Sequence, residues 1–250
     1  MTKATPLFPG LDWALVVPMA NEEPDFAPFI RELYSSLEEI GSGKVYLILD
    51  NASKDRSLEL CHKLSEQDKR FITVWAPENK NLAQAYLRGY AEALANGHRY
   101  IIEMDAGLSH DPHSLSLFLQ ALDSGISCAW GSRFIAGGSM IHSSFRRKFL
   151  SRAGTWLANF LLGTKLHDMT SGYQGFSREA IQKFVHYPLR SKAHFYQTEL
   201  RYLMRGWKSI EIPISYSAPS PGVSASSVLN SITTLGWYAW RRFTFRPVAL

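Results

Sequence analysis

The chain contains 250 residues, of which 46% are hydrophobic and 20% charged, a balance typical of a folded domain with a large core rather than of a disordered chain. The two cysteines, Cys61 and Cys128, are too few for a disulfide framework, and the first residues lack the basic-then-apolar pattern of a secretory signal. No stretch reaches the ~18 to 20 apolar residues that a spanning helix needs. These features predict a cytoplasmic protein, either soluble or peripheral at the cytoplasmic face of a membrane.

Charge is distributed unevenly along the chain, although the net charge is only +5. Residues 1–125 carry 11 Lys and Arg against 18 Asp and Glu, a net −7, whereas residues 126–250 carry 16 against 4, a net +12. No acid lies from Ser124 to His167. This division suggests carboxylates that handle a cation and basic groups that face phosphate, nucleic acid or an anionic membrane. Scattered lysines on a solvated surface are the alternative.

Short apolar runs alternate with amphipathic helical patterns through the first half of the chain. Strands are expected at residues 14–18, 45–50, 71–75, 100–105 and 127–134. Helices are expected at residues 26–40, 57–67, 82–94 and 114–125. This alternation predicts an α/β fold in which helices cover both faces of a mostly parallel central sheet.

Polar side chains follow three of these strands, at the sheet edge where ligands of α/β proteins bind. They are Asn21 and Glu22 after the first strand, Asp50, Asn51 and Asp55 after the second, and Asp105 after the fourth. Carboxylates gathered at one edge repel one another unless a cation or a hydrogen-bonding ligand lies between them. Individually, Asp55 could cap a helix and Asp50 could order a turn.

Several well-known motifs are absent from the sequence. It contains no G-x-G-x-x-G after the first strand, no P-loop, no G-x-S-x-G elbow and no H-E-x-x-H or Cys/His zinc spacing. Dinucleotide, P-loop, serine-ester and zinc chemistry are therefore disfavoured. His110 and His113 are interpreted as residues of a turn and a helix start.

Nine segments, in order, resemble family 2 glycosyltransferases of the GT-A fold, and most of all the dolichol-phosphate and polyprenyl-phosphate sugar transferases. The segments are VVPMANEE, LDNASKDRS, LAQAYLRGYAEA, MDAGLSHDP, GSRFIAGG, FRRKFLSRAG, DMTSGYQGFSREA, FYQTEL and IEIPISY. The resemblance implies inverting transfer of a sugar from a GDP- or UDP-linked donor to a polyprenyl phosphate at the membrane surface. Transfer to a polysaccharide or small-molecule hydroxyl, and non-catalytic binding of a nucleotide sugar, are the alternatives.

The resemblance also implies a donor site. Its expected members are Pro18, Asn21, Glu22, Asp50, Asn51, Arg88, Asp105, Ala106, Gly107, Ser132 and Arg133. Asn51 departs from the aspartate common in the family, but an amide can still pair with a uracil or guanine edge.

Asp105 resembles the first aspartate of the family's D-x-D motif, which binds Mg²⁺ or Mn²⁺ and stabilises the leaving nucleoside diphosphate. Gly107 stands where the second aspartate belongs. The expected ligands are therefore Asp105, diphosphate oxygens, waters and Ser109, and the metal is expected to be weak or dispensable. An inactive, degenerate site is the alternative.

The expected acceptor site comprises Arg147, Ser171, Gly172, Gln197 and Glu199. Arg147 resembles an arginine that binds phosphate in the polyprenyl-phosphate enzymes, and with Asp105 and Asp168 it makes up the expected catalytic set. Asp168 is the candidate general base if the acceptor is an alcohol, whereas a phosphate acceptor is already ionised. Alternatively, Asp168 caps a turn, and Glu199 pairs with Arg201 or Arg205.

The end of the chain departs from the polyprenyl-phosphate enzymes. Their R-x-x-G-x-S-K element is replaced by SAPSPGVSAS, which puts Pro219 and Ala225 at the two basic positions and weakens the lipid-phosphate assignment. We divide the chain into a GT-A domain at 1–225 and an amphipathic helical tail at 226–250. The aromatic and arginine residues of the tail predict contact with an anionic membrane surface, and a docked helix is the alternative. Nucleic acid is not an expected partner, because the catalytic edge is acidic.

Overall fold

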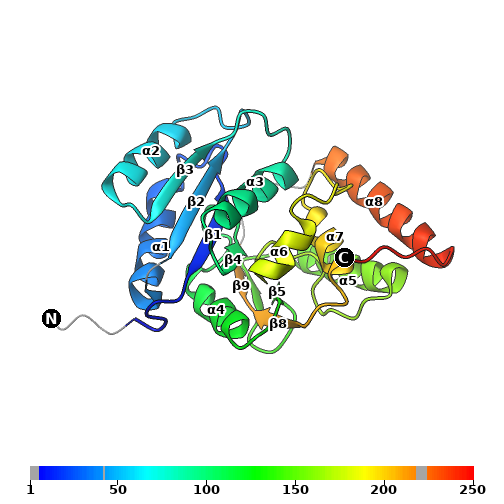
Figure 1. Ribbon diagram of the computed structural model, residues 1–250. Coiled ribbons are helices and arrows are strands. Elements are labelled where there is room, and N and C mark those ends of the chain that lie inside the picture. Colours follow the sequence, from blue (N-terminus) through cyan, green and yellow to red (C-terminus); the bar gives the residue numbers. More distant parts are fainter. Residues whose placement is uncertain (1–5, 42, 218–223) are drawn as a thin grey trace.

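The computed structural model describes residues 6–41, 43–217 and 224–250. Within these ranges, a seven-stranded sheet lies at the centre of the molecule in the order β3-β2-β1-β4-β7-β5-β8 (Figure 1). Its strands are β1 (Trp13–Pro18), β2 (Lys44–Leu49), β3 (Phe71–Trp75), β4 (Tyr100–Glu103), β5 (Cys128–Ser132), β7 (Gln174–Ser177) and β8 (Ser209–Pro213). A small second sheet pairs β6 (Ser139–Ile141) with β9 (Ser215–Ser217).

Helices surround the central sheet. They are α1 (Phe26–Ile40), α2 (Ser57–Gln67), α3 (Leu82–Ala95), α4 (Leu115–Asp123), α5 (Phe145–Leu162), α6 (Arg178–Phe184), α7 (Tyr196–Leu203) and α8 (Ala225–Phe243), with a 3-10 turn η1 (Pro112–Ser114). The pairs β1–β2, β1–β4, β2–β3 and β5–β8 are parallel, which confirms the predicted fold class. The exception is β7, which runs antiparallel between β4 and β5.

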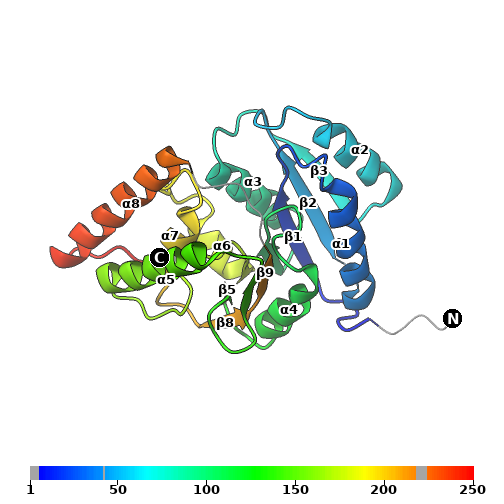
Figure 2. The ribbon, with the colours of Figure 1, turned by 180° about the vertical axis from the view of Figure 1, so that it is seen from behind.

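Helices cover both faces of the sheet because alternate side chains of a strand point to opposite sides. Trp13, Leu15 and Val17 of β1 belong to a core that they share with α1, α2 and α4. Ala14 and Val16 belong to a second core with α3, α6 and α7. Figures 1 and 2 show the helices on the two faces of the sheet from opposite sides.

Gly89 lets α3 approach the sheet closely. A Cβ atom at this position would lie 2.2 Å from Cγ1 of Val16, so no larger residue fits without a shift of the helix or strand. The close approach places Tyr86, one turn earlier, beside Asp105, to which its hydroxyl donates a hydrogen bond of 2.5 Å. The packing of α3 thus shapes the carboxyl edge of the sheet.

The C-terminal tail, which contains α8, docks on the domain. A docked helix was the alternative to membrane contact in the sequence analysis. Leu235 and Tyr238 of α8 pack with residues of α5 and α7 in a third cluster, at the end of the molecule opposite α1 and α2 (Figure 2). Arg242 donates to the carbonyls of Phe160 and Leu161 at 2.9 and 3.0 Å, which satisfies the C-terminus of α5. The division at residue 225 coincides with the first residue of α8 and otherwise stays a prediction.

Candidate active site

The carboxyl ends of β1, β2 and β4 meet at one edge of the sheet because these strands run parallel. The loops that follow β1 and β2 are bonded to each other. The side-chain oxygen of Asn21 accepts from the backbone N–H of Lys54 at 2.8 Å, and the backbone N–H of Glu22 donates to Oγ of Ser57 at 2.8 Å. Asn21 has a φ of 61°, a left-handed conformation that asparagine tolerates.

The remaining residues predicted at the first two strand ends lie on the same edge. Pro18 is the last residue of β1 and pairs in register with β2. Asp50 accepts from the backbone N–H of Ala52 at 2.8 Å, so it does order a turn. The Asn51 amide donates to the carbonyl of Pro77 at 2.9 Å, which joins the loops after β2 and β3.

Two other charged residues near this edge are engaged by protein groups. The Arg88 guanidinium pairs with the carboxylates of Glu78 and Glu92, the latter at 2.7 Å. Asp55 accepts from the backbone N–H of Ser57, the first residue of α2, at 3.0 Å, although the N-cap position of this helix is Arg56 and not Asp55. For Arg88 to contact the donor, its guanidinium would have to leave one of these two carboxylates and bind the diphosphate instead.

Asp105 lies at the centre of the edge, with its side chain 32% exposed. One carboxylate oxygen accepts from the Tyr86 hydroxyl, and the other lies 3.4 Å from Nε2 of His110, within ion-pair range but long for a hydrogen bond. Burial raises the pKa of Asp105, but the interactions with His110, His194 and Tyr86 together outweigh this effect, so its pKa is lowered. The carboxylate is therefore ionised at neutral pH and open to a cation.

The loop after Asp105 explains the glycine at the second D-x-D position. Gly107 has a φ of 78°, a left-handed conformation that favours glycine, and a Cβ there would lie 3.6 Å from a carboxylate oxygen of Glu22. Ala106 is half-buried against the core. The carbonyl of Ser109 accepts from the backbone N–H of Ser217 at 2.9 Å, which ties this loop to β9.

Glu22 has a strongly shifted titration. Burial, followed by repulsion from Asp25, Asp105 and Asp55, raises the pKa of Glu22 from 4.5 to about 7. The unfolded chain therefore releases this proton at lower pH than the folded protein does. Glu22 makes the free energy of unfolding fall as the pH rises from about 4.5 to about 7.

Glu22→Gln is expected to raise the melting temperature by a few degrees near pH 8 and to change it little near pH 5, where Glu22 is already neutral. The measurement is thermal unfolding at both pH values in the presence of a chelator. Glu32→Gln, an exposed glutamate of α1, is the matched control and should give the same small change at both pH values. An equal effect of Glu22→Gln at the two values would contradict the raised pKa.

The donor set at this edge fits a metal that arrives with phosphate. No group of three or more His, Cys, Asp or Glu within the described ranges is arranged to hold a metal ion. Asp105 nevertheless offers an ionised, partly exposed carboxylate, and Mg²⁺ commonly binds one or two carboxylates together with substrate phosphates and waters. A one-carboxylate site is compatible with this chemistry.

A buried ion pair lies beyond β5. Arg133 is 7% exposed and Asp168 is fully buried. Arg133 donates to Asp168 through Nε at 2.7 Å, Nη2 at 2.9 Å and its backbone N–H at 3.1 Å. Burial raises the pKa of Asp168, but its hydrogen bonds and ion pair with Arg133 outweigh this effect and lower the pKa to about 2. So weak a base, without exposure, argues against the general-base role expected for Asp168.

Ser132 and Arg201 flank this pair. Ser132 is fully buried at the end of β5, where its carbonyl accepts from the backbone N–H of Ile214 at 3.1 Å. Arg201, on α7, donates to the carbonyl of Gly131 at 3.3 Å, and burial lowers the pKa of Arg201 to about 10. Asp168 also attracts Arg201 electrostatically, with smaller contributions from Glu211 and Glu103, so its carboxylate acts on two buried guanidinium groups.

The predicted acceptor turn lies directly against Asp105. A Cβ at Gly172 would be 2.6 Å from the amide nitrogen of Gln197 and 2.8 Å from a carboxylate oxygen of Asp105. Ser171, immediately before it, is buried. The structure thus brings Gly172, Gln197 and Asp105 together, although they are far apart in the sequence.

Arg147 and Glu199, also predicted on the acceptor side, have different surroundings. Arg147 lies on α5, half-buried, and donates to the Tyr216 hydroxyl at 2.9 Å. Glu199 is fully buried and accepts from the Tyr238 hydroxyl at 2.6 Å and from two backbone N–H groups at 2.8 Å, so it anchors α8. Its partners are not Arg201 or Arg205. Pro219, at one of the two positions that are basic in the polyprenyl-phosphate enzymes, lies outside the described residues.

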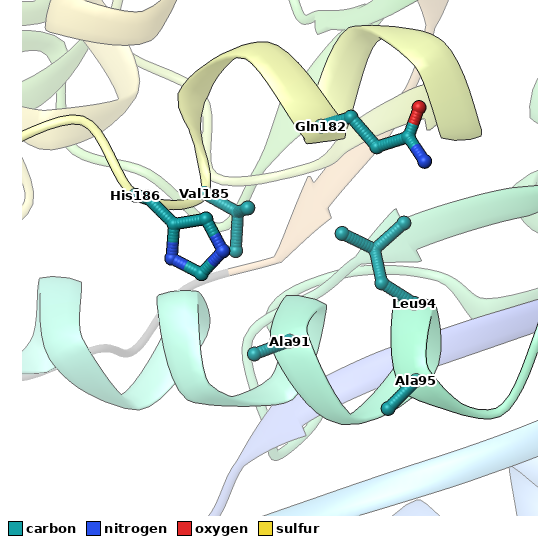
Figure 3. A pocket seen from close by; sticks show the side chains of 6 residues that line it. All are labelled: Ala91, Leu94, Ala95, Gln182, Val185 and His186. Atoms are coloured by element: carbon teal, nitrogen blue, oxygen red, sulfur yellow. The ribbon is translucent and has the colours of Figure 1, made fainter.

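The pocket in Figure 3 lies apart from this site. It has a volume of about 390 Å³ and is lined by Ala91, Leu94 and Ala95 of α3 and by Gln182, Val185 and His186 in and after α6. These α3 residues follow Tyr86 by more than a helical turn and lie toward the amino edge of the sheet, so the pocket is separate from Asp105.

Comparison with known proteins assigns the chain to a family. Residues 14–185 match the family model described as glycosyl transferase family 2. The chain belongs to glycosyltransferase family 2. The predicted resemblance is confirmed, and the chain is a glycosyltransferase.

Two relatives of this family 2 enzyme are similar over most of their length. Polyprenol monophosphomannose synthase of Mycolicibacterium smegmatis is 31% identical over 86% of this chain and 81% of its own. Undecaprenyl-phosphate mannosyltransferase of Micrococcus luteus is 28% identical over 74% of this chain and 79% of its own.

A solved structure with the same fold is glucosyl-3-phosphoglycerate synthase from Mycobacterium tuberculosis, in complex with Mn²⁺, uridine diphosphate and glucosyl-3-phosphoglycerate. The TM-score is 0.62 at 15% identity, and the match covers 95% of this chain and 80% of the other. At this identity the likeness supports the GT-A fold alone.

Three residues that contact predicted site residues were not themselves predicted from the sequence: Tyr86 and His110 lie beside Asp105, and Tyr216 is bonded to Arg147. Tyr86 could have been found, because it lies on the buried face of a helix that begins at the carboxyl edge of the sheet. His110 was interpreted as a turn residue, but it is buried beside Asp105. Tyr216 had no local signal, because its neighbours come from distant segments.

Proposed function

We propose that this enzyme transfers a sugar, with inversion, from a nucleoside diphosphate sugar to a polyprenyl phosphate at a membrane surface. The observation that carries the proposal is that the acidic donor edge lies near the acid-free, basic segment 124–167. His110, 3.4 Å from Asp105, packs against the ring of Tyr216, and the Tyr216 hydroxyl accepts from Arg147 of that segment. The names of the two relatives, both enzymes of polyprenyl-phosphate mannose chemistry, support it.

The chemistry of a phosphate acceptor suits the residues present. An ionised phosphate oxygen attacks the anomeric carbon as the bond from that carbon to the diphosphate oxygen breaks, and the nucleoside diphosphate leaves. Because the nucleophile carries no proton to remove, no general base is required. This agrees with an Asp168 whose pKa is lowered to about 2 by Arg133. Its role is to hold Arg133.

The donor would be held at the edge formed by Pro18, Asn21, Glu22, Asp50 and Asn51. We propose that Asp105, with the diphosphate oxygens and waters, binds Mg²⁺ or Mn²⁺, and Ser109 is a further candidate ligand. A bound divalent ion supplies charge stabilisation of the leaving diphosphate.

Metal binding is expected to depend on the nucleotide. Calorimetry should detect little binding of Mn²⁺ or Mg²⁺ alone, because one carboxylate is a weak site, and at least tenfold tighter binding when GDP or UDP is present. Chelator alone is the control. Tight binding of the metal without nucleotide would contradict the one-carboxylate site.

The test of the function is transfer from GDP- and UDP-linked sugars to a short-chain prenyl phosphate, with the matching prenyl alcohol and an oligosaccharide as parallel acceptors. Turnover of the phosphate but not the alcohol supports the proposal. Turnover of the alcohol or oligosaccharide alone would replace it with the hydroxyl-acceptor alternative. Nucleotide binding without any turnover would indicate a non-catalytic binder.

A membrane partner accounts for an exposed apolar face on α5 and α8. No helix in the described ranges is long and apolar enough to cross a bilayer. The exposed large apolar side chains are Phe145, Phe149, Leu150, Trp156, Leu157 and Phe160 on α5, and Val228, Leu229, Ile232, Trp240 and Phe243 on α8. The α8 segment also carries arginines and no acid. Such a face suits an anionic bilayer surface.

Phe149→Glu combined with Trp240→Glu is expected to weaken binding to vesicles that contain anionic lipid by roughly tenfold or more, because each change removes a large apolar group and adds a negative charge. The measurement is vesicle co-sedimentation at low and high salt. Leu117→Glu, at an exposed leucine of α4, is the control and should bind as wild type. Equal binding by all three proteins would contradict the membrane role of this face.

A further inference from the structure

Two tyrosines of α3 face two carboxylates at the end of β4. The Tyr86 hydroxyl donates to Asp105 at 2.5 Å, and the Tyr90 hydroxyl donates to Glu103. Residues four apart on a helix lie on one side of it, separated by ~6 Å along the axis, and residues two apart on an extended strand are separated by ~6.6 Å. Because the two spacings match, each carboxylate meets its own tyrosine.

Tyr86 is held firmly behind Asp105. Its side chain is fully buried, and its ring stacks on the ring of Tyr196 of α7, with the ring centres 5.2 Å apart. Gly89, three residues further along α3, allows the close approach of this helix to the sheet. The hydroxyl of Tyr86 therefore has a defined position before any ligand binds.

The two oxygens of the Asp105 carboxylate have different surroundings. Oδ1 accepts the hydrogen bond from Tyr86. A Cβ at Gly172 would lie 2.8 Å from Oδ2, and Nε2 of His110 lies 3.4 Å from the same oxygen. Of these neighbours, Tyr86 is the one within normal hydrogen-bond distance, so it determines how the carboxylate is turned.

The hydrogen bond from Tyr86 restricts a rotation that is otherwise soft. The terminal torsion of an aspartate side chain has a broad energy profile, so a carboxylate without a fixed partner samples many orientations. A hydroxyl that donates to an ionised carboxylate makes a short, charge-assisted bond, which is stronger than a bond between neutral groups. Gly107 supplies no second carboxylate in this loop. Metal binding therefore depends strongly on the orientation of Asp105.

We propose that Tyr86 is a positioning residue for the metal site, and that its hydroxyl holds the Asp105 carboxylate in the orientation that binds the divalent ion of the nucleotide complex. In this role Tyr86 acts through Asp105 and not on the substrate. The role rests on the proposed function and deepens it, because it names a residue that compensates for the missing second aspartate.

The experiment measures the affinity of wild type and Tyr86→Phe for GDP and for UDP by calorimetry, once with Mn²⁺ and once with chelator. Phenylalanine keeps the ring that stacks on Tyr196 and removes the hydroxyl. Loss of a group that orients a metal ligand typically weakens metal binding about 10- to 100-fold, so the gain in nucleotide affinity that Mn²⁺ brings should fall about tenfold. Nucleotide affinity in chelator should stay within about twofold of wild type, because no metal is then involved.

Tyr90→Phe is the matched control. Tyr90 is a fully buried tyrosine one turn further along α3, and its hydroxyl is bonded to Glu103 rather than to Asp105. This variant also removes a buried hydroxyl from α3, so its melting temperature should fall by a similar amount. The gain from Mn²⁺ should stay as in wild type. Equal losses of that gain in both variants would assign the effect to the packing of α3 and overturn the role of the Tyr86 hydroxyl.

The direction of the change is a further test. A donated hydrogen bond also withdraws charge from the carboxylate, so if Tyr86 acted in this way alone, its loss would tighten metal binding. An unchanged or larger gain from Mn²⁺ in Tyr86→Phe would therefore overturn the positioning role and leave the proposed function intact. Wild-type protein that binds neither nucleotide, or that gains nothing from Mn²⁺, would instead overturn the metal-assisted donor site, so the two failures are distinguishable.

Discussion

Asp105→Asn is expected to reduce the rate of sugar transfer by roughly a thousandfold or more, equivalent to about 4 kcal/mol of lost transition-state stabilisation. Asparagine keeps an oxygen that can accept from the Tyr86 hydroxyl, so the packing of α3 against the edge should persist. What it lacks is the negative charge that would hold a divalent ion at the leaving diphosphate. The measurement is the initial rate at saturating donor and acceptor.

Asp111→Asn is the matched control for this change. Asp111 lies on the same loop, is exposed, and accepts from the backbone N–H of His113 at the start of η1. It should retain nearly the full rate, with a melting temperature close to that of Asp105→Asn. A near-wild-type rate for Asp105→Asn would refute the role of this carboxylate and mean that transfer does not depend on a metal ion held by Asp105.

The first half of the fold could be predicted from the sequence because its strands are continuous apolar runs with helical patterns between them. Because parallel strands end at one edge of a sheet, the sequence also placed Glu22, Asp50 and Asp105 correctly at that edge. β7 escaped prediction because Gln174 and Gly175 carry no β-sheet signal, and its order between β4 and β5 depends on tertiary packing.

The partners of the buried charges could not be predicted, because sequence spacing does not reveal which loops converge. Asp168 and Arg133 are 35 residues apart, and Glu199 and Tyr238 are 39 apart. Each carboxylate has a candidate role when considered alone. Only the folded chain reveals that one neutralises an arginine and the other anchors α8.

Asp168→Asn is expected to lower the free energy of unfolding by about 3 to 5 kcal/mol, because it leaves the buried guanidinium of Arg133 without its ion-pair partner and removes the strongest carboxylate attraction on Arg201. In a chain of this size the melting temperature should fall by about 10 °C. The measurement is thermal and denaturant unfolding between about pH 5 and pH 8.

The lowered pKa of Asp168 fixes the sign of its pH dependence. Its folded-state pKa of about 2 lies below the ordinary value of 3.8, so its stabilising effect is complete above about pH 4 and is lost as the pH falls toward 2. The difference between Asp168→Asn and wild type should therefore be constant from pH 5 to pH 8. A difference that changes by more than about 1 kcal/mol across this range would contradict the lowered pKa.

A double variant distinguishes the two roles of the pair. Asp168→Asn with Arg133→Gln removes both charges, so it should recover part of the stability that Asp168→Asn alone loses. Transfer should remain impaired, because the site then lacks the buried cation of Arg133. Full recovery of transfer along with stability would mean that Arg133 and Asp168 serve the fold alone, whereas recovered stability without transfer supports a buried carboxylate whose function is to hold an arginine for substrate binding.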